Sequence, residues 1–348
     1  MAYTTINKST DYFNNKLWTG DGSSSRNITG VGFQPDWVWG KCRNTTVSHA
    51  LYDVVRGSSK LLSSNGASAE GTNAALNAFV SDGFTVNSDS YLNGNSNTYV
   101  AWNWKAGTAV SGQTTGSGTY KTYTGSVNTT SGFSIIKYTG NGTAGHTIPH
   151  RLGVAPKMIM VKSVNANEDW MVYNKNSGAS NFLILNATAA AASGTQWNST
   201  TPTSSVFSIG SNNNMNQNGN NFIAYCFANV QGYSQFAGYT GNNNTNGPFI
   251  YTGFKPAFII IKKSSNAGNN WYMWDNKRNT SNLTNKYLNP DLSSAEGTAN
   301  YGHIDILSNG FKTRSAANDE INQSGHTFIY MAFGQTLVGT NNTPNNAF

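Results

Sequence analysis

The chain is poor in charged residues. Asp, Glu, Lys and Arg make up 11% of its 348 residues, less than half of the share of about 25% that is usual in globular proteins. The stretch from Asn176 to Phe254 contains none of them and no His. Surface contacts should therefore depend little on ionic strength, because there is little charge to screen. This composition is unusual for a cytosolic enzyme and typical of extracellular or particle-surface proteins, and 12% aromatic residues indicate folded cores.

Cysteines and metal-binding patterns are scarce as well. Two cysteines, Cys42 and Cys226, exclude a disulfide framework, and no zinc-ligand spacing is present. We expect both thiols to be reduced and buried. His146 and His150 lie four residues apart, but Pro149 between them rules out a helix, so we expect a loop rather than a metal site. Motifs for nucleotide or metalloprotease chemistry are missing, and no cofactor is predicted.

Long apolar runs and basic stripes are also missing. No segment approaches the roughly 18 consecutive apolar residues of a membrane span, and Met1–Thr10 lacks the apolar stretch of a signal peptide. We therefore expect neither membrane insertion nor secretion. The net charge of +7 comes from scattered residues, with pairs such as Lys262-Lys263 but no run of five. A nucleic-acid partner is not expected, because such surfaces need a basic stripe.

What the chain does contain is a phrase that occurs three times. It reads Gly, apolar residue, any residue, Pro, then an apolar run with a Lys, at Gly32–Lys41, Gly153–Lys162 and Gly253–Lys262. The spacing of about 100 to 120 residues is that of a domain rather than of a solenoid repeat. Four further anchors keep the same order around each copy, the last being an aromatic-rich segment at Tyr99–Trp104, Phe222–Phe227 and Phe328–Phe333. The sequence therefore predicts an internal triplication.

These anchors have the composition of β-strands. They are short runs rich in Val, Ile, Phe, Tyr and Trp, bounded by Gly, Asn and Ser. The Pro stands where a strand would begin, so its missing N–H costs little. Apolar residues on both faces predict a central strand that is covered on both sides. We expect an all-β fold of three tandem β-sandwich modules, jelly-roll or concanavalin-like, with short helices at most at Asn73–Phe79 and Ala187–Ala192.

The repeats also predict domain boundaries. We expect the first β-sandwich at 1–106, a flexible Gly/Ser/Thr linker at 107–131, the second β-sandwich at 132–231 and the third at 232–348. No such spacer separates the second and third repeats, so these two should pack rigidly together.

Catalysis is not predicted. Cleavage of a polysaccharide needs two carboxylates about 5 to 10 Å apart. The middle repeat has Asn174 where the others have Asp, and it lacks the matching Glu. A structural role, such as capping a turn or pairing with Arg56 or Lys277, explains the recurrence better. The carboxylates in question occupy equivalent positions in the first and third repeats: Asp53, Glu70, Asp275 and Glu296.

Some aromatic residues offer an alternative function. Aromatic rings in loops can stack on sugar rings, although any aromatic-rich β protein leaves some rings partly exposed without a functional reason. The candidate glycan contacts are the aromatics that the pattern does not assign to a core: Tyr91, Trp197, Trp271 and Tyr272.

A resemblance spans nearly the whole chain. It is carried by Gly30–Trp39, Gly132–Thr143, Pro202–Ser208, Ile223–Ala228, Gly247–Phe254 and Tyr330–Phe333. These segments are similar to a module abundant in marine tailed phages, whose proteins are uncharacterised virion components sometimes labelled tail-fibre or concanavalin-like lectin. Relatives often have Gly where this chain has Arg151, and Ala-Glu where it has Gly334-Gln335. The resemblance implies a virion protein and assigns no chemistry.

Together these observations predict a virion-surface structural protein, assembled in the host cytoplasm and released by lysis. Without heptads for a coiled-coil shaft, a compact capsid decoration or tail knob is favoured over a fibre. Its partners would be other virion proteins and further copies of itself in a homo-oligomer. The alternative is a tail-fibre receptor-binding module that recognises host-surface glycans. A polysaccharide-cleaving enzyme is the third reading.

Overall fold

Almost all regular structure in this protein is β. The computed structural model describes residues 3–299, 303–316 and 320–338, and its helices in those ranges are short: the 3-10 helix η1 (Ser9–Asp11) and α1 (Asn213–Asn216). The predicted all-β class is confirmed. The helices predicted at 73–79 and 187–192 are wrong: Asn73 accepts a hydrogen bond from the N–H of Ala75 at 2.7 Å in a turn, and neither segment is helical.

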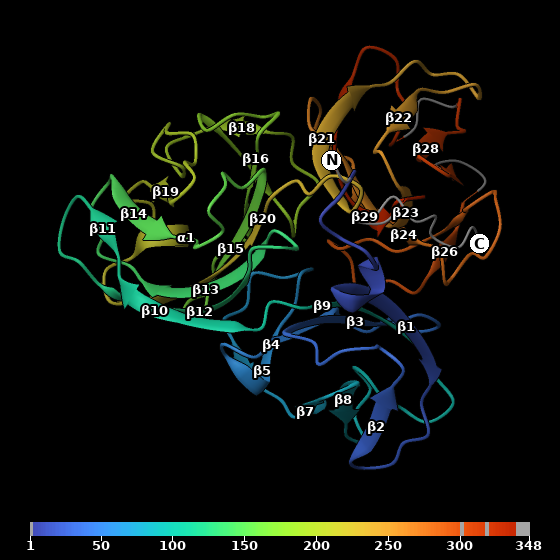
Figure 1. Ribbon diagram of the computed structural model, residues 1–348, viewed down its shortest axis with the longest axis horizontal. Coiled ribbons are helices and arrows are strands. Elements are labelled where there is room, and N and C mark those ends of the chain that lie inside the picture. The colour runs from blue at the N-terminus through green and yellow to red at the C-terminus, as the bar shows by residue number, and fades with distance from the viewer. Residues whose placement is uncertain (1–2, 300–302, 317–319, 339–348) are drawn as a thin grey trace.

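Three lobes surround a common centre (Figure 1). The first lobe, blue in the figure, contains β1 to β9 in two sheets. Its large sheet has the order β1 (Phe13–Thr19), β9 (Thr98–Trp104), β3 (Trp37–Cys42), β4 (Ala50–Asp53), β5 (Gly57–Leu62) and β6 (Gly71–Thr72). Its small sheet has the order β2 (Arg26–Thr29), β8 (Gly83–Val86) and β7 (Leu76–Val80).

The second lobe, mainly green in Figure 1, contains β10 to β20. Its large sheet has the order β10 (Thr108–Gln113), β12 (Thr122–Asn128), β13 (Phe133–Thr139), β20 (Asn221–Phe227), β15 (Met158–Ser163), β16 (Met171–Asn174), β17 (Asn181–Ile184) and β18 (Ala192–Ser193). Its small sheet has the order β11 (Thr115–Gly116), β14 (His146–Pro149) and β19 (Val206–Ile209).

The third lobe, yellow to red in Figure 1, contains β21 to β29. Its large sheet has the order β21 (Ser234–Thr240), β29 (Thr327–Gln335), β23 (Lys255–Lys263) and β24 (Trp271–Asp275). A small sheet has the order β22 (Phe249–Tyr251), β28 (Gly310–Thr313) and β27 (Ile304–Leu307), and a separate pair consists of β25 (Lys286–Tyr287) and β26 (Gly297–Thr298).

Four antiparallel strands recur in the same order in every large sheet: β1-β9-β3-β4, β13-β20-β15-β16 and β21-β29-β23-β24. The Pro phrase supplies β3, β15 and β23, each between an aromatic-rich strand and a shorter one. In β23 the Pro lies inside the strand, and the register shifts between Pro256 and Phe258. Such an irregularity accommodates a residue that has no N–H to donate.

Each of these central strands is buried on both faces. Val38 points into a core between the two sheets of its own lobe. Trp37 and Trp39 point the other way, into a core built by all three lobes. There the Trp37 ring stacks on Tyr225 of the second lobe at 4.4 Å, and Phe333 of the third lobe lies 5.1 Å from Phe13. The chain is therefore β-sandwich-like in each lobe, with a second core between lobes.

The segment predicted as a flexible linker, 107–131, forms strands instead. Strands β10 and β12 extend the large sheet of the second lobe, and β11 joins its small sheet. Asp36 of the first lobe holds this segment, since its carboxylate accepts hydrogen bonds from the Ser126 hydroxyl at 3.0 Å and the Ala106 N–H at 2.9 Å. The Gly, Ser and Thr composition that indicates a linker is here that of a polar edge whose side chains are mostly exposed. The domain boundaries stay a prediction.

Candidate functional site

The carboxylates of the first lobe lie in a buried ion network. The Arg56 guanidinium contacts Asp53 at 2.6 Å and Glu70 at 3.2 Å, and the side chains of Asp53 and Arg56 have no exposed surface. The second Asp53 oxygen accepts the N–H groups of Val55 and Arg56. Burial lowers the pKa of Arg56, but Asp53, Tyr225 and Glu70 together outweigh this and raise the pKa above its ordinary value. The hydroxyl of Tyr225, from the second lobe, also donates to Asp53 at 2.7 Å.

The third lobe contains a matching network. The Arg278 guanidinium contacts Asp275 at 2.5 Å and Glu296 at 3.2 Å. Two residues of the first lobe complete it: the Trp102 indole N–H donates to Asp275 at 3.1 Å, and Arg43 contacts Glu296 through both ends of its guanidinium. The ion-pair partner of Asp275 is thus Arg278, whereas Lys277 donates its backbone N–H to the Asp275 carboxylate.

These networks can hold lobes together but are poorly placed for chemistry. The guanidinium, hydroxyl and indole donors already occupy the Asp53 and Asp275 carboxylates, which are fully buried. The pairing with Arg56 that the sequence suggested is present. In the second lobe Asn174 and Ser177 stand where the others have Asp and Arg, and the Asn174 amide nitrogen has no hydrogen-bond partner within the described residues.

Hydrogen bonds at equivalent positions link the lobes in a ring. The N–H of Glu70 donates to Val164 O at 3.0 Å, joining the first lobe to the second. The N–H of Ala191 donates to Ser264 O at 2.8 Å, joining the second lobe to the third. The ring closes where the N–H of Glu296 donates to the carbonyl of Arg43 at 2.6 Å. Each lobe is therefore hydrogen-bonded to both of the others.

Two predicted glycan contacts are not at the surface. Trp197 has no exposed area and packs against Tyr173 and Phe207 in the core of the second lobe. Trp271 is 1% exposed, and its indole N–H donates to Ile184 O in the second lobe at 2.9 Å. A ring enclosed in this way cannot stack on a sugar, so both predictions are wrong.

The other two predicted contacts are partly exposed but lie apart. Tyr91 belongs to the first lobe, where it packs against the core. Tyr272 lies on β24 of the third lobe, with its ring 5.7 Å from Trp274 and 5.1 Å from Tyr287. The structure does not bring the four predicted residues together.

A pair of exposed aromatics on one strand was missed. Phe249 and Tyr251 on edge strand β22 are 48% and 58% exposed, and Ile250 between them is buried. The alternation of β22 places both rings on one outer face. The Tyr251 hydroxyl lies 3.5 Å from that of Tyr3. In the sequence, the signal for this pair is the run Phe249-Ile250-Tyr251, because a strand that buries Ile250 turns both neighbouring rings outward.

The predicted histidine loop is also corrected. His146 lies in β14 with no exposed area, and its Nε2 is 2.6 Å from the Thr114 hydroxyl. His150 follows that strand, and burial lowers its pKa to about 4. Among the described residues no group of His, Cys, Asp and Glu could hold a metal ion. Both cysteines are free and buried, as predicted.

Three lysines are buried at equivalent places in the repeated strands. Lys41, Lys162 and Lys262 have no exposed area, and burial lowers the pKa of each to about 8. Each ammonium donates to a backbone carbonyl rather than to a carboxylate: Cys42 O, Ser163 O and Asn269 O, respectively.

The third lobe also buries a carboxyl group. Asp291 accepts the Trp271 N–H at 3.2 Å, and its other oxygen has no hydrogen-bond partner within the ranges that the structure describes. Burial raises the pKa of Asp291 to about 7.

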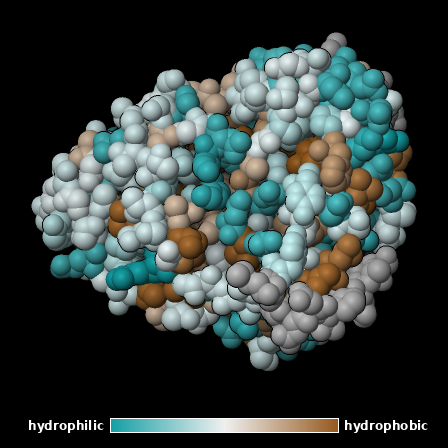
Figure 2. Space-filling view, turned by 45° about the horizontal axis from the view of Figure 1, so that its top comes forward, coloured by the Kyte–Doolittle hydropathy of each residue, from teal (hydrophilic) through white to brown (hydrophobic). Residues whose placement is uncertain are grey.

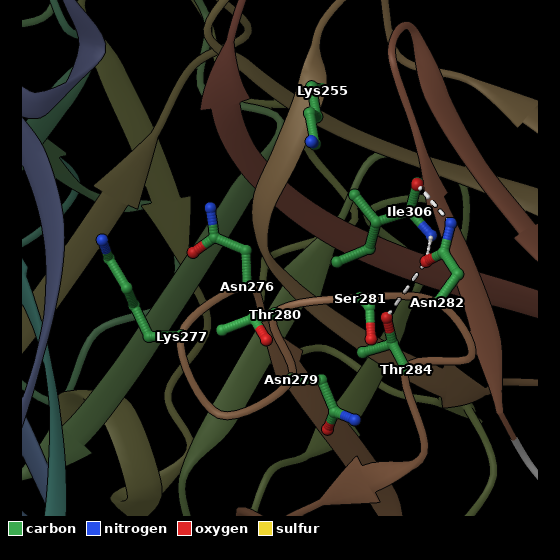
Figure 3. A pocket seen from close by; sticks show the side chains of 9 residues that line it. All are labelled: Lys255, Asn276, Lys277, Asn279, Thr280, Ser281, Asn282, Thr284 and Ile306. Carbon is green, nitrogen blue, oxygen red and sulfur yellow. Dashed lines mark hydrogen bonds between the residues drawn. The ribbon is translucent and has the colours of Figure 1, made fainter. Parts of the chain in front are cut away.

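A polar groove of about 320 Å³ lies in the third lobe (Figure 3). Its size is at the lower end of the range of about 300–1,000 Å³ for small-molecule sites. Lys255 extends down toward the cavity and Lys277 stands at its left edge, with Asn276 between them. The remaining lining residues are Asn279, Thr280, Ser281, Asn282, Thr284 and Ile306.

Side-chain bonds hold one wall of this groove. The Asn282 amide donates to Ile306 O and accepts the Ile306 N–H, both at 2.9 Å, which fixes the loop before β25 to the edge of β27. The Asn279 carbonyl accepts the N–H of Lys286 at 3.0 Å. No acidic residue lines the groove, and no described carboxylate lies within ion-pair distance of Lys255 or Lys277.

The face of the molecule drawn in Figure 2 is mostly hydrophilic. Figure 2 shows small apolar patches separated by polar side chains rather than one continuous apolar face. No helix of the described residues is long and apolar enough to cross a membrane.

Fold and site thus define a β-sandwich-like protein of three interlocked lobes with a polar groove in the third. The chain belongs to the family of the domain of unknown function DUF7483, which matches residues 8–336. The family description states no function. No curated protein and no solved structure matches the chain.

Proposed function

We propose that this chain is a structural protein of a phage virion surface, without a catalytic role. The observation that carries the proposal is the closed ring of three lobes, in which the strongest candidate carboxylates serve as ties between lobes. A scaffold of this kind supplies a rigid shape rather than a reactive centre. The low charge and the resemblance to virion components add support.

The scaffold arose by triplication of one β-sandwich unit of the jelly-roll or concanavalin type. The recurrence of one strand order in three large sheets supports this. The equivalent hydrogen bonds of Glu70, Ala191 and Glu296 to the next lobe support it as well. Three fused copies give one chain the arrangement that a homotrimer builds from separate subunits.

On the particle the protein decorates the capsid or forms a knob at the tail, in contact with other virion proteins. Copies of the chain assemble as a symmetric oligomer, which gains anchorage through multivalency. Its place of action is the virion surface, after assembly in the host cytoplasm.

Labelling of particles tests the location. Purified particles from a culture that produces this chain should bind a gold-labelled antibody against it at fixed positions on head or tail. Particles that lack the chain are the control. Intact particles without label, together with the chain in the soluble lysate fraction alone, would refute a virion location. Light scattering that finds only monomer at micromolar concentration would refute the oligomer.

A second function, recognition of host-surface glycans, is favoured by the groove of the third lobe. The groove has the polar lining that sugar hydroxyls require, with amide, hydroxyl and ammonium groups on its walls. A glycan array with the purified protein tests this function, and an array without any bound saccharide would remove it.

A further inference from the structure

We propose that the groove of the third lobe selects acidic saccharides, with Lys255 and Lys277 as the counter-charges of a sugar carboxylate or sulfate. The proposal rests on the glycan-binding function proposed above and names the class of glycan. It is argued from the pairing of charges, from a comparison of the lobes and from the chemistry of the lining.

Neither Lys255 nor Lys277 forms an ion pair within the part of the chain that the structure describes. Both lysines belong to the lining of a cavity that no carboxylate lines. Electrostatic complementarity therefore favours a ligand that carries negative charge.

The fold does not require these lysines. Lys255 precedes the Pro of the repeated phrase, and Gln34 and Ala155 stand there in the other lobes. Lys277 follows the Asp of the short strand by two residues, where the other lobes have Val55 and Asn176.

The first lobe provides a natural comparison. It has a hollow of about 490 Å³ lined in part by Gln34 and Val55 at the same repeat positions. Strands β10 and β12 of the second lobe form the opposite wall of that hollow. The two lysines thus distinguish the groove of the third lobe from an equivalent place that is neutral at both positions.

The rest of the lining suits hydroxyl groups rather than nucleobases. Thr280 and Ser281 present hydroxyls, and Asn282 is held by its two bonds to Ile306. Fixed polar groups of this kind recognise a ligand without the cost of ordering themselves. No aromatic ring lines the groove, whereas binding of single-stranded nucleic acid relies on aromatic stacking. An acidic saccharide therefore fits better than a nucleic acid.

Calorimetric titration of the full chain tests the proposal. The probes are tetragalacturonate, a sulfated dextran oligosaccharide, neutral dextran of equal length and a short single-stranded DNA. The wild type should bind an acidic oligosaccharide more tightly than neutral dextran or DNA, with an affinity that falls as salt is raised.

The double variant Lys255→Gln and Lys277→Val copies the residues of the first lobe. It should lose affinity for the acidic oligosaccharide on the order of 10- to 100-fold, as expected when two charge-assisted contacts are removed. The matched control, Lys121→Gln with Lys137→Gln, removes the same charge elsewhere and should bind as the wild type does.

The outcomes separate this proposal from the function on which it rests. Equal losses in the two double variants, or tighter binding of DNA, would overturn the groove assignment. Binding of neutral dextran that survives in Lys255→Gln/Lys277→Val but is lost in Phe249→Ser/Tyr251→Ser would move glycan binding to β22 and overturn only the acidic groove. If neither these probes nor any array glycan binds, both proposals fail.

Discussion

The junction between the first and second lobes and the junction between the second and third differ in chemistry. At the former, Asp53 lies between Arg56 of its own lobe and Tyr225 of the next. At the latter, the equivalent positions carry Asn174 and Ser177. Both junctions nevertheless keep the same backbone hydrogen bond to the neighbouring lobe. A buried ion network is therefore not required at every junction, and where present it ties the lobes and also fixes which lobe meets which, a use of buried charge with precedent in other proteins.

The largest loss of stability is expected when one partner of the buried Asp53–Arg56 ion pair is removed. Arg56→Ala leaves the Asp53 carboxylate buried without its counter-charge, and should lower the free energy of unfolding by about 3–5 kcal/mol. Urea denaturation followed by tryptophan fluorescence measures this. The control is Ser177→Ala at the equivalent place in the second lobe, which should change stability by about 0.5 kcal/mol or less. Equal effects of the two substitutions would contradict the comparison.

A smaller effect is expected when the first junction is given the residues of the second. Asp53→Asn combined with Arg56→Ser removes both charges together, so the loss should be about 1–2 kcal/mol and less than that of Arg56→Ala alone. A double-mutant cycle measures the coupling between the two positions. Strictly additive losses would show that Asp53 and Arg56 do not act as a pair.

The buried lysines predict how stability changes above neutral pH. Because burial lowers the pKa of Lys41, Lys162 and Lys262 from 10.5 to about 8, the unfolded chain binds more protons between these values. Stability should therefore rise from pH 8 toward about pH 10 and fall as pH drops to 8. Melting temperatures across this range measure the trend, which Lys162→Met should weaken. A melting temperature that does not change with pH in the wild type would argue against the lowered pKa values.

The last prediction concerns the third lobe alone. Burial raises the pKa of Asp291 from 3.8 to about 7, so the folded chain holds this proton more tightly than the unfolded one. Its contribution to stability is complete below pH 3.8 and is lost as pH rises through 7. Asp291→Asn should remove this part of the decline between pH 4 and 7 in a thermal melt series. A variant with the same decline as the wild type would assign it to other groups.

The sequence predicts the β class because local signals and tertiary structure agree there. The Pro phrase becomes β3, β15 and β23, and the apolar residues on both of their faces correspond to two separate cores. The pairing of Asp53 with Arg56 was also accessible, since the two residues lie three apart in the chain.

The errors arise where strand pairing and packing, rather than local composition, decide the structure. The segment 107–131 is rich in Gly, Ser and Thr, but pairing with β13 and β14 makes it part of two sheets. Trp271 starts a strand, but it lies in the core shared by the three lobes, where its indole N–H donates to Ile184 O of the second lobe. The groove was invisible because Lys255 and Lys277 are separated by a strand and a loop, and no local pattern states that they border one cavity.

Because the ring of lobes is closed, no lobe can be removed without exposing the core that all three share. In a linear array of modules, removal of a terminal module exposes the buried surface of only one neighbour. Here the loss of any lobe would expose apolar core residues of both remaining lobes, because residues from all three lobes pack in one core. Phe333 of the third lobe, for example, contacts Trp104 of the first lobe and Phe227 of the second. Expression of single lobes should accordingly give insoluble material, and the chain should melt as one cooperative body.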